Sequence, residues 1–329
     1  MTRFRERTLH AAAEAASIFD RFPLENRTSF DIIRAVKDLG FPVMFRPMKG
    51  LLGATVTVEE GAQGILVTTK RGLPIQRFTL AHELGHLVLG HEMRFDFLTE
   101  DADEATPDAS DNPEEKAAEA FASELLAPRK LISRIALGRT WRKPDLNRPA
   151  TVYQLALRLG ISFKATCWAL ARGGFIDDKS AKDLAEDTKV NEIKTNLIAP
   201  HGLSENPWAD IWAVTPEDAG SLLECGPDDL FVVAVQDEPS AGFLWELDES
   251  AQGFEVVFEK TDISESYGGE CSRVLVMKNN APGHHRLTLK NRRPWSGEVL
   301  STTDYSIANF GKETDGLPRF VKLELLGAG

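Results

Sequence analysis

The chain has 329 residues, of which 42% are hydrophobic and 27% are charged, and its formal net charge is -12. The length predicts two or three domains with sizeable cores, and the composition is ordinary for a soluble globular protein. The acidic balance argues against a broad surface for nucleic acid or anionic membrane, because such a surface needs an excess of Lys and Arg.

The sequence contains no apolar run long enough to cross a membrane, and its N-terminus lacks the apolar centre of a secretory signal. The three cysteines, Cys167, Cys225 and Cys271, are scattered and show no paired spacing. This pattern argues against a disulfide framework and against a metal site built from cysteines. The sequence therefore predicts a reduced, cytoplasmic protein with no membrane partner.

The front of the chain predicts a helix followed by three short strands. Residues 29–39 place apolar side chains on one helical face, and Gly40 ends that pattern. The segments FPVMF (41–45), LLGATVTV (51–58) and GILVTT (64–69) have the composition of strands. The last is either an edge strand, which could bind an extended peptide by main-chain hydrogen bonds, or an ordinary strand within a sheet.

Two helices with an acidic segment between them follow. Pro74 stands where a first helical turn would begin, and a helix is predicted over residues 75–89. Residues 93–115 are strongly acidic and poor in apolar side chains, which predicts a loop. Residues 113–128, PEEKAAEAFASELLAP, predict the next helix, with a proline near each end.

The rest of the chain divides into a helical stretch and a β-rich part. Residues 151–176 predict a helix, a short turn and a second helix, with Gly160 ending the first and Ser162 capping the second. Beyond about residue 180, alternating apolar segments recur between turn residues, which indicates an all-β sandwich. We therefore predict an α+β chain with three regions, residues 1–130, 131–190 and 191–329.

The most informative stretch is RFTLAHELGHLVLGHE, at residues 77–92. His82 and His86 lie one turn apart on a helix, so both imidazoles project from the same face and can reach one metal ion. Glu83 is turned by about 100° from His82, so its carboxylate can take a proton from water without binding the metal. We interpret the stretch as the zinc site of a hydrolase with Glu83 as its base, and a chance occurrence of HExxH is the alternative.

A catalytic zinc ion needs a third protein ligand and an open position. His91 follows His82 by nine residues, about half a turn away on a continuous helix, so we interpret it as structural. The helix over residues 113–128 offers Glu115 at the N-terminal end of its apolar face, unless that glutamate only stabilises the helix N-terminus. Glu119, one turn further, is either a partner that orients a histidine or the ligand itself.

This stretch, the sequence before it and the later segments EKAAEAFASELLAP and LALRLGISFKATCWALARGG resemble the ImmA/IrrE family of bacterial zinc metallopeptidases, over roughly residues 25–175. The resemblance implies a gluzincin-like site in which His82, His86 and Glu115 bind zinc and Glu83 is the base. It also implies a protein substrate, namely a helix-turn-helix repressor whose cleavage releases genes for stress response or mobile-element transfer.

The chain departs from the family's pattern in the second motif. Ala117 stands where the family usually has a glutamate, and Glu119 stands where it usually has Asn or Asp. The third ligand is therefore left open between Glu115 and Glu119.

Residues 151–174 also fit a helix-turn-helix DNA reader. A reading helix presents polar and basic side chains to bases and phosphates. The second helix here offers Lys164 and Arg172, whereas Phe163 and Cys167 have the character of a core. We favour a structural helical pair that packs against the peptidase.

Three loops in the β-rich part form a second set of motifs. They are EPSAGFLWEL at residues 238–247, YGGE at 267–270 and RRPW at 292–295. In this order they resemble the NPTTGY-type, GxG-type and RPW-type loops of the chagasin family of cysteine-protease inhibitors, over roughly residues 205–310. The resemblance implies an immunoglobulin-like sandwich whose loops cluster at one end and wedge into a protease cleft.

The resemblance places partner-binding residues in these loops: Pro239, Gly242, Phe243, Gly268, Gly269, Arg293, Pro294 and Trp295. Glu238 replaces the family's usual Asn, and Ser240 and Ala241 replace its paired threonines. From the residues alone, Trp245 is predicted in the core and Trp295, in a turn, on an exposed contact surface. We expect this domain to recognise a partner or to shield the peptidase cleft.

The preferred interpretation is a cytoplasmic, zinc-dependent endopeptidase with a gluzincin-like domain, a helical extension and a chagasin-like domain for partner recognition or regulation. Its cofactor is Zn2+, its partners are proteins, and no direct contact with nucleic acid is expected. The alternatives are a non-catalytic protease inhibitor with a structural zinc site and a DNA-binding regulator. A zinc site closed by a fourth protein ligand would favour the first, and salt-sensitive duplex binding would favour the second.

Overall fold

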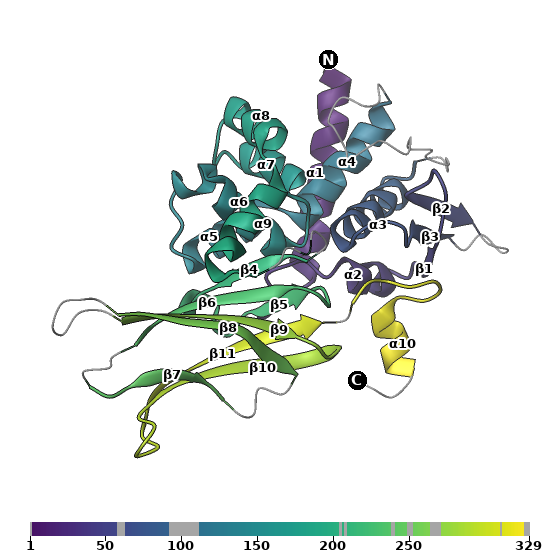
Figure 1. Cartoon of the computed structure of the whole chain (residues 1–329). Coiled ribbons are helices and arrows are strands. Elements are labelled where there is room, and N and C mark those ends of the chain that lie inside the picture. The colour runs from purple at the N-terminus through teal and green to yellow at the C-terminus, as the bar shows by residue number, and fades with distance from the viewer. Residues whose placement is uncertain are drawn as a thin grey trace.

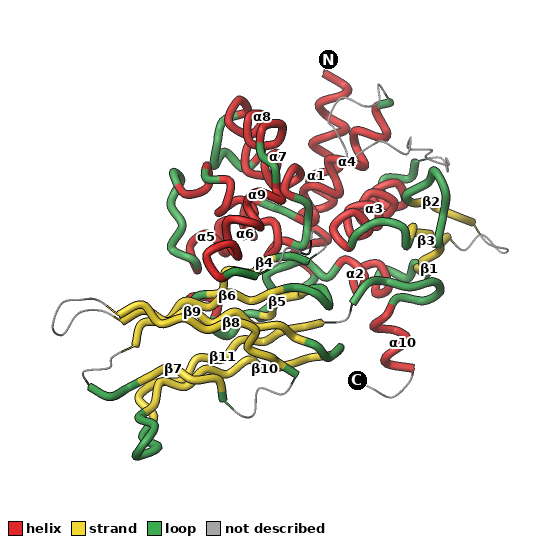
Figure 2. The backbone as a smooth tube through the Cα atoms, viewed as in Figure 1, coloured by secondary structure: helices red, strands yellow, loops and turns green. Residues whose placement is uncertain are grey.

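The computed structural model describes residues 2–57, 63–91, 112–203, 206, 209–237, 241–248, 253–263, 271–309 and 311–325. Most of the acidic segment and the predicted loop residues Pro239, Gly268 and Gly269 lie outside these ranges. Helices gather in one half of the molecule (Figure 1), and the other half is built from strands in two layers (Figure 2). Within the described ranges, no helix is long and apolar enough to cross a bilayer.

The N-terminal part builds a small sheet covered by helices. Its elements are α1 (Thr2–Arg21), α2 (Ile32–Asp38), β1 (Val43–Arg46), β2 (Gly53–Thr57), β3 (Gln63–Thr68), α3 (Leu73–Val88) and α4 (Pro113–Leu126). The strand order is β1-β3-β2, with β3 parallel to β1 and antiparallel to β2. Of the two interpretations of GILVTT, the edge strand is wrong, because β3 hydrogen-bonds to a neighbour on each side and β2 is an edge.

Further helices pack onto this part. They are α5 (Arg129–Gly138), α6 (Pro149–Leu159), α7 (Phe163–Arg172), α8 (Asp178–Asp187) and α9 (Val190–Ile198). The pair α6 and α7 is as predicted: Gly160 takes the left-handed conformation with a φ of 66°, and Ser162 accepts a hydrogen bond from the Ala165 N–H at 3.1 Å. One apolar core runs from Ala11 to Ile193, so these helices share their interior with the N-terminal part.

Arg172, one of the two basic residues of α7, is turned toward α4. Its guanidinium donates a hydrogen bond to the carbonyl of Ser123 at 3.1 Å and lies 3.9 Å from Glu124. Burial raises the pKa of Glu124, and the nearby charge of Arg172 opposes that shift. The helical pair therefore packs as a structural unit, and a DNA-reading role for α7 loses one of its two cations.

The C-terminal part is a β-sandwich. Its strands are β4 (Ile211–Val214), β5 (Leu222–Cys225), β6 (Leu230–Asp237), β7 (Leu244–Leu247), β8 (Phe254–Ile263), β9 (Cys271–Asn279), β10 (Gly283–Arg292) and β11 (Val299–Asn309), followed by the helix α10 (Arg319–Leu325). They form two four-stranded sheets, ordered β5-β11-β10-β7 and β4-β6-β9-β8. A second apolar core includes Trp212, Phe231 and Tyr305, and Trp245 packs partly buried against it. The predicted α+β class with a C-terminal sandwich is confirmed.

A buried ionic cluster joins the sandwich to the helices. Asp218, in the short 3-10 turn before β5, is 2% exposed. Its carboxylate accepts hydrogen bonds from Arg158 of α6 at 3.0 and 2.9 Å, and from Arg139 at the end of α5. Arg158 also donates to the carbonyl of Ala213 in β4 at 3.0 Å. One carboxylate thus balances two buried guanidinium groups across the interface.

Each half also covers a sheet edge of the other. Arg27 forms a parallel bridge with Leu222 of β5, an edge strand of its sheet. Gly316, beyond the last strand, forms an antiparallel bridge with Phe45 of β1, and the two residues exchange N–H···O bonds of 2.8 Å. The chain therefore leaves the N-terminal part after α9, builds the sandwich and returns to pair with the first sheet.

Candidate metal centre

Helix α3 carries two histidines through the interior of the N-terminal part. Pro74 lies in its first turn, where the missing N–H of proline disturbs no helical hydrogen bond. Further along, Glu83 is 3% exposed and His86 is 9% exposed. His82 and His86 are one turn apart, so both rings face the neighbouring helix α4.

Helix α4 brings a carboxylate to the same place. Asn112 caps it by accepting a hydrogen bond from a backbone N–H of its first turn at 3.0 Å, and Glu115 lies in that turn. The two helices approach closely because Gly85 of α3 has no side chain, and a Cβ there would lie 3.2 Å from the Cα of Ala118. The small residues of both helices therefore set the distance between the histidines and the carboxylate.

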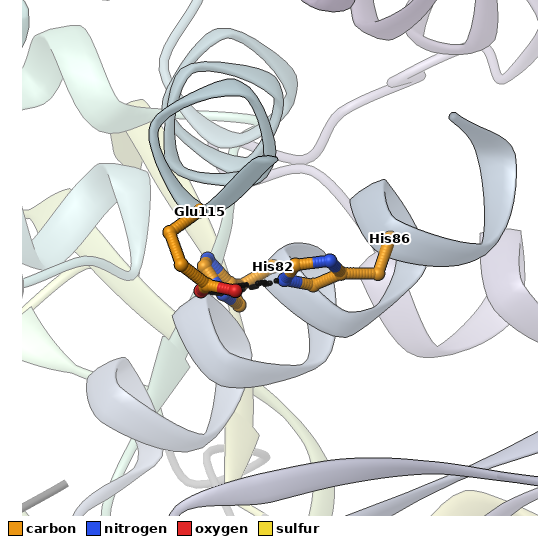
Figure 3. Close-up of side chains that lie close together, drawn as sticks. All are labelled: His82, His86 and Glu115. Atoms are coloured by element: carbon orange, nitrogen blue, oxygen red, sulfur yellow. Dashed lines mark hydrogen bonds and ion pairs between the residues drawn. The ribbon is translucent and has the colours of Figure 1, made fainter. Parts of the chain in front are cut away.

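The three side chains converge on one point (Figure 3). His82 Nε2 lies 3.2 Å from Glu115 Oε2, and His86 Nε2 lies 3.1 Å from His82 Nε2 and 3.5 Å from the same oxygen. Zinc bound tetrahedrally at about 2.0–2.1 Å needs ligand atoms about 3.3 Å apart. The donor set and its spacing therefore fit a zinc ion. Within the described ranges, these three residues form a group whose candidate ligand atoms all lie within 4.8 Å of one another.

The electrostatics of this cluster favour an ionised carboxylate. Burial by itself raises the pKa of Glu115, but hydrogen bonds from His82 and His86 outweigh burial and hold that pKa well below its ordinary value. A charged carboxylate beside two imidazole nitrogens is a donor set that suits zinc. Glu119 is not among the converging ligand residues. Its charge instead acts on Arg172, whose pKa it raises against the effect of burial.

Glu83 lies against the edge of the sheet. A Cβ on Gly53 of β2 would lie 2.8 Å from Glu83 Oε1 and 2.4 Å from Thr79 Cγ2. The carboxylate therefore occupies space that any side chain at position 53 would take. Strand β2 passes directly beside the group that the sequence suggests as the base.

His91 contacts the cluster from outside. Its Nδ1 lies 3.0 Å from the Nδ1 of His86, and the two ring centroids are 5.0 Å apart. Burial lowers the pKa of His91 and the charge of His86 acts in the same direction, whereas the charges of Glu114 and Glu115 oppose this shift. The sequence interpretation of His91 as structural misses this contact with a candidate ligand.

The loops of the sandwich form a second candidate site. Its described members are Gly242, Phe243, Arg293, Pro294 and Trp295. Trp295 is 74% exposed, and its ring lies so close to Gly242 that a Cβ there would be 2.3 Å away. The guanidinium of Arg293 lies 4.4 Å from the ring centroid of Phe243. Phe243 is 5% exposed, so its side chain lies under the exposed members and is not available to a partner. The other four residues come from two loops far apart in sequence and form one surface, which we call the Trp295 surface.

The Trp295 surface is remote from the metal cluster. In Figure 1, β7 and the turn between β10 and β11 lie at the opposite end of the molecule from α3. The described loops therefore leave the cluster uncovered. The sequence led us to expect that this domain either recognises a partner or shields the peptidase cleft. The described loops do not shield the cleft.

Two family models match the chain, each over one of its parts. Residues 36–170 match the IrrE N-terminal-like domain of peptidase family M78, and residues 226–308 match the chagasin family of peptidase inhibitors, I42. The two matches lie on separate parts of the chain. Both resemblances drawn from the sequence are confirmed, and the first match supports a peptidase with a metallopeptidase-like function.

A search of curated proteins gives no match. Similar solved structures include the cysteine protease inhibitor EhICP2 from Entamoeba histolytica, with 21% identity and a TM-score of 0.29, covering 32% of this chain and 99% of that one. Amebosin has 14% identity and a TM-score of 0.27, covering 30% and 97%. PbICP-C, in its complex with falcipain-2, has 16% identity and a TM-score of 0.20, covering 32% and 95%.

Proposed function

We propose that the protein is a zinc-dependent endopeptidase, with Zn2+ held by His82, His86 and Glu115 and with Glu83 as the general base. The observation that carries this proposal is the convergence of three ligand atoms at the spacing of a zinc site. The carboxylate of Glu83 is buried, lies on the same helix as the two histidines and is not among the three ligand atoms. Bound zinc would act as a Lewis acid that polarises a scissile carbonyl and makes water more acidic.

The remaining roles, proton transfer and substrate binding, are proposed for Glu83 and strand β2. Glu83 takes a proton from the attacking water, and its place beside β2 puts this step at the edge of the sheet. An extended substrate segment can pair with an edge strand through main-chain hydrogen bonds. Strand β2 is therefore proposed to guide the substrate past Glu83.

The substrate is proposed to be a protein, which the peptidase-family match supports. Its class is proposed to be a helix-turn-helix transcriptional repressor. Residues 1–130 hold the site, residues 131–190 support it and residues 191–329 bind a partner. The setting is proposed to be a reducing cytoplasm, because Cys167, Cys225 and Cys271 are all unpaired and buried.

Zinc content tests the proposed ligands. The wild type, Glu115→Gln and Glu119→Gln are purified without added metal, and metal per chain is measured by atomic emission. We expect about one zinc ion in the wild type and in Glu119→Gln, and loss of zinc in Glu115→Gln, because an amide binds zinc poorly. Loss only in Glu119→Gln would move the third ligand by one turn, and a wild type that takes up no zinc would refute the site.

The Trp295 surface supports a second activity. Its aromatic and glycine residues are held in place by contacts between two loops, so the surface is formed before any partner arrives. We propose that it binds a protein partner, and the chagasin-family match makes a cysteine protease the first candidate. Its distance from the metal cluster would let one chain engage both partners.

Trp295→Ala tests this second activity. An exposed aromatic anchor contributes about 2 kcal/mol to binding, so the inhibition constant against papain is expected to rise by about 30-fold. Leu137→Ala is the control, because Leu137 is 78% exposed on α5, outside the Trp295 surface. A wild type that leaves papain fully active would remove the cysteine-protease assignment.

A further inference from the structure

The end of helix α3 places His91 directly over His86. The helix stops at Val88, and Gly90 takes a left-handed conformation with a φ of 67°. The His91 N–H then bonds to the His86 carbonyl at 3.0 Å, and the Gly90 N–H bonds to the Leu87 carbonyl at 3.3 Å. These two bonds define a Schellman motif, which brings the residue after the glycine back against the last full turn.

In most such motifs the returning side chain makes an apolar contact. Here an imidazole meets an imidazole, with ring planes at 70° and Nδ1 atoms 3.0 Å apart. Two ring nitrogens 3.0 Å apart form a hydrogen bond with one proton between them, so one Nδ1 donates and the other accepts. The identity of the donor decides which tautomer His86 adopts.

The metal cluster fixes that identity. His86 turns its Nε2 toward His82 Nε2 and Glu115 Oε2, so Nε2 must offer a lone pair if the cluster holds zinc. The proton of a neutral His86 then sits on Nδ1. Its partner within hydrogen-bond distance is His91 Nδ1, which must accept.

We infer that His91 is a positioning residue of the metal centre, whose Nδ1 accepts a hydrogen bond from His86 and holds that ring in its metal-binding tautomer. The inference rests on the proposed zinc site and adds to it a residue outside the ligand set. Metal-binding histidines usually donate to a carboxylate, a carbonyl or water, and loss of that partner weakens metal binding by about 10–100-fold.

A role for His91 as a fourth ligand does not fit the geometry. Its Nδ1 faces the Nδ1 side of the His86 ring, whereas the cluster lies on the Nε2 side. Among the residues described, the group of candidate ligand atoms contains His82, His86 and Glu115 and leaves His91 out. The open position of a catalytic site is therefore preserved.

A matched pair of variants tests the inference. The Oδ1 atom of Asn stands where Nδ1 of histidine stands and can accept the same hydrogen bond, whereas Leu has a similar shape and no acceptor. The full-length wild type, His91→Asn, His91→Leu and the control His10→Leu are titrated with zinc against a chromophoric chelator. His10 is a suitable control because it lies on α1 with 67% of its side chain exposed.

We expect His91→Leu to bind zinc about 10–100-fold more weakly and His91→Asn to stay within about threefold of the wild type. His10→Leu should match the wild type. Urea unfolding of the zinc-free proteins should be the same for Leu and Asn, which separates positioning from a general loss of structure.

An unchanged zinc affinity in His91→Leu would overturn the inference and leave the proposed site intact. Equal losses in Leu and Asn would also overturn it, because rescue by the acceptor oxygen would be absent. Three imidazole ligands in the X-ray absorption spectrum of the zinc-loaded wild type would make His91 a ligand instead. A wild type that binds no zinc would reject the proposed function itself, which is a different result from any of these.

Discussion

Glu83→Gln is expected to abolish proteolysis while zinc stays bound. The amide has the size of the carboxylate, so the packing of this 3% exposed side chain against Gly53 is preserved. The amide cannot take a proton from water, and the loss of a general base lowers kcat by about 10²–10⁴-fold. Zinc should remain, because Glu83 is not in the group of converging ligand atoms.

Cleavage is measured by mass spectrometry on helix-turn-helix repressors incubated with zinc-loaded wild type or variant, and zinc is counted in the same samples. Glu114→Gln is the matched control, because Glu114 precedes Glu115 in the first turn of α4 and lies outside the ligand group. It should cleave as the wild type does. Full activity in Glu83→Gln would exclude this residue as the base, and loss of zinc would assign it to the metal instead.

Asp218→Ala is expected to lower the free energy of unfolding by about 3–5 kcal/mol, the range for removing one partner of a buried ion pair. The side chains of Arg158 and Arg139 are 0% and 8% exposed, so both would keep a buried charge without their carboxylate. Burial and the nearby charge of Arg158 together lower the pKa of Arg139 to about 10, although the charge of Asp218 opposes both. Without Asp218 the two cations repel each other inside the interface.

Urea denaturation followed by tryptophan fluorescence measures this loss. Glu192→Ala is the comparison, since its pair with Lys189 is 68% and 77% exposed and should contribute less than about 1 kcal/mol. Asp218→Asn should fall between the two, because its amide oxygen still accepts a hydrogen bond. If Asp218→Ala unfolds at the wild-type urea concentration, the cluster does not hold the two halves together.

The candidate site was largely predictable because its signals are local. The four-residue spacing of His82 and His86 is a property of any helix, and Pro113 and Asn112 mark where α4 begins. The choice of Glu115 over Glu119 was open in the sequence, because both face the same side of one helix and only the crossing with α3 separates them. The contact between His91 and His86 was not predicted, because the angle between His82 and His91 was worked out for one continuous helix. Gly90 was the sequence signal that the helix ends before His91.

The fold was predictable within each element and less so between elements. The strand pattern of the sandwich follows from alternation, but an apolar run such as GILVTT reads the same in a central or an edge strand. Helix α9 begins at Val190, where the β-rich pattern was expected to have started already. The pairing of Asp218 with Arg158 and Arg139 joins residues about 60 to 80 positions apart, and no local pattern carries that information.

The bridge between Phe45 and Gly316 makes the order of synthesis matter for this protein. At ordinary elongation rates, roughly 15–55 s separate the emergence of these two residues from a ribosome. During that interval β1 presents an uncovered edge, the kind of strand that pairs with other chains. The metal-binding half is made first, but the edge of its first strand is covered at Phe45 only when Gly316 arrives. A chain that terminates before residue 316 would keep that edge uncovered.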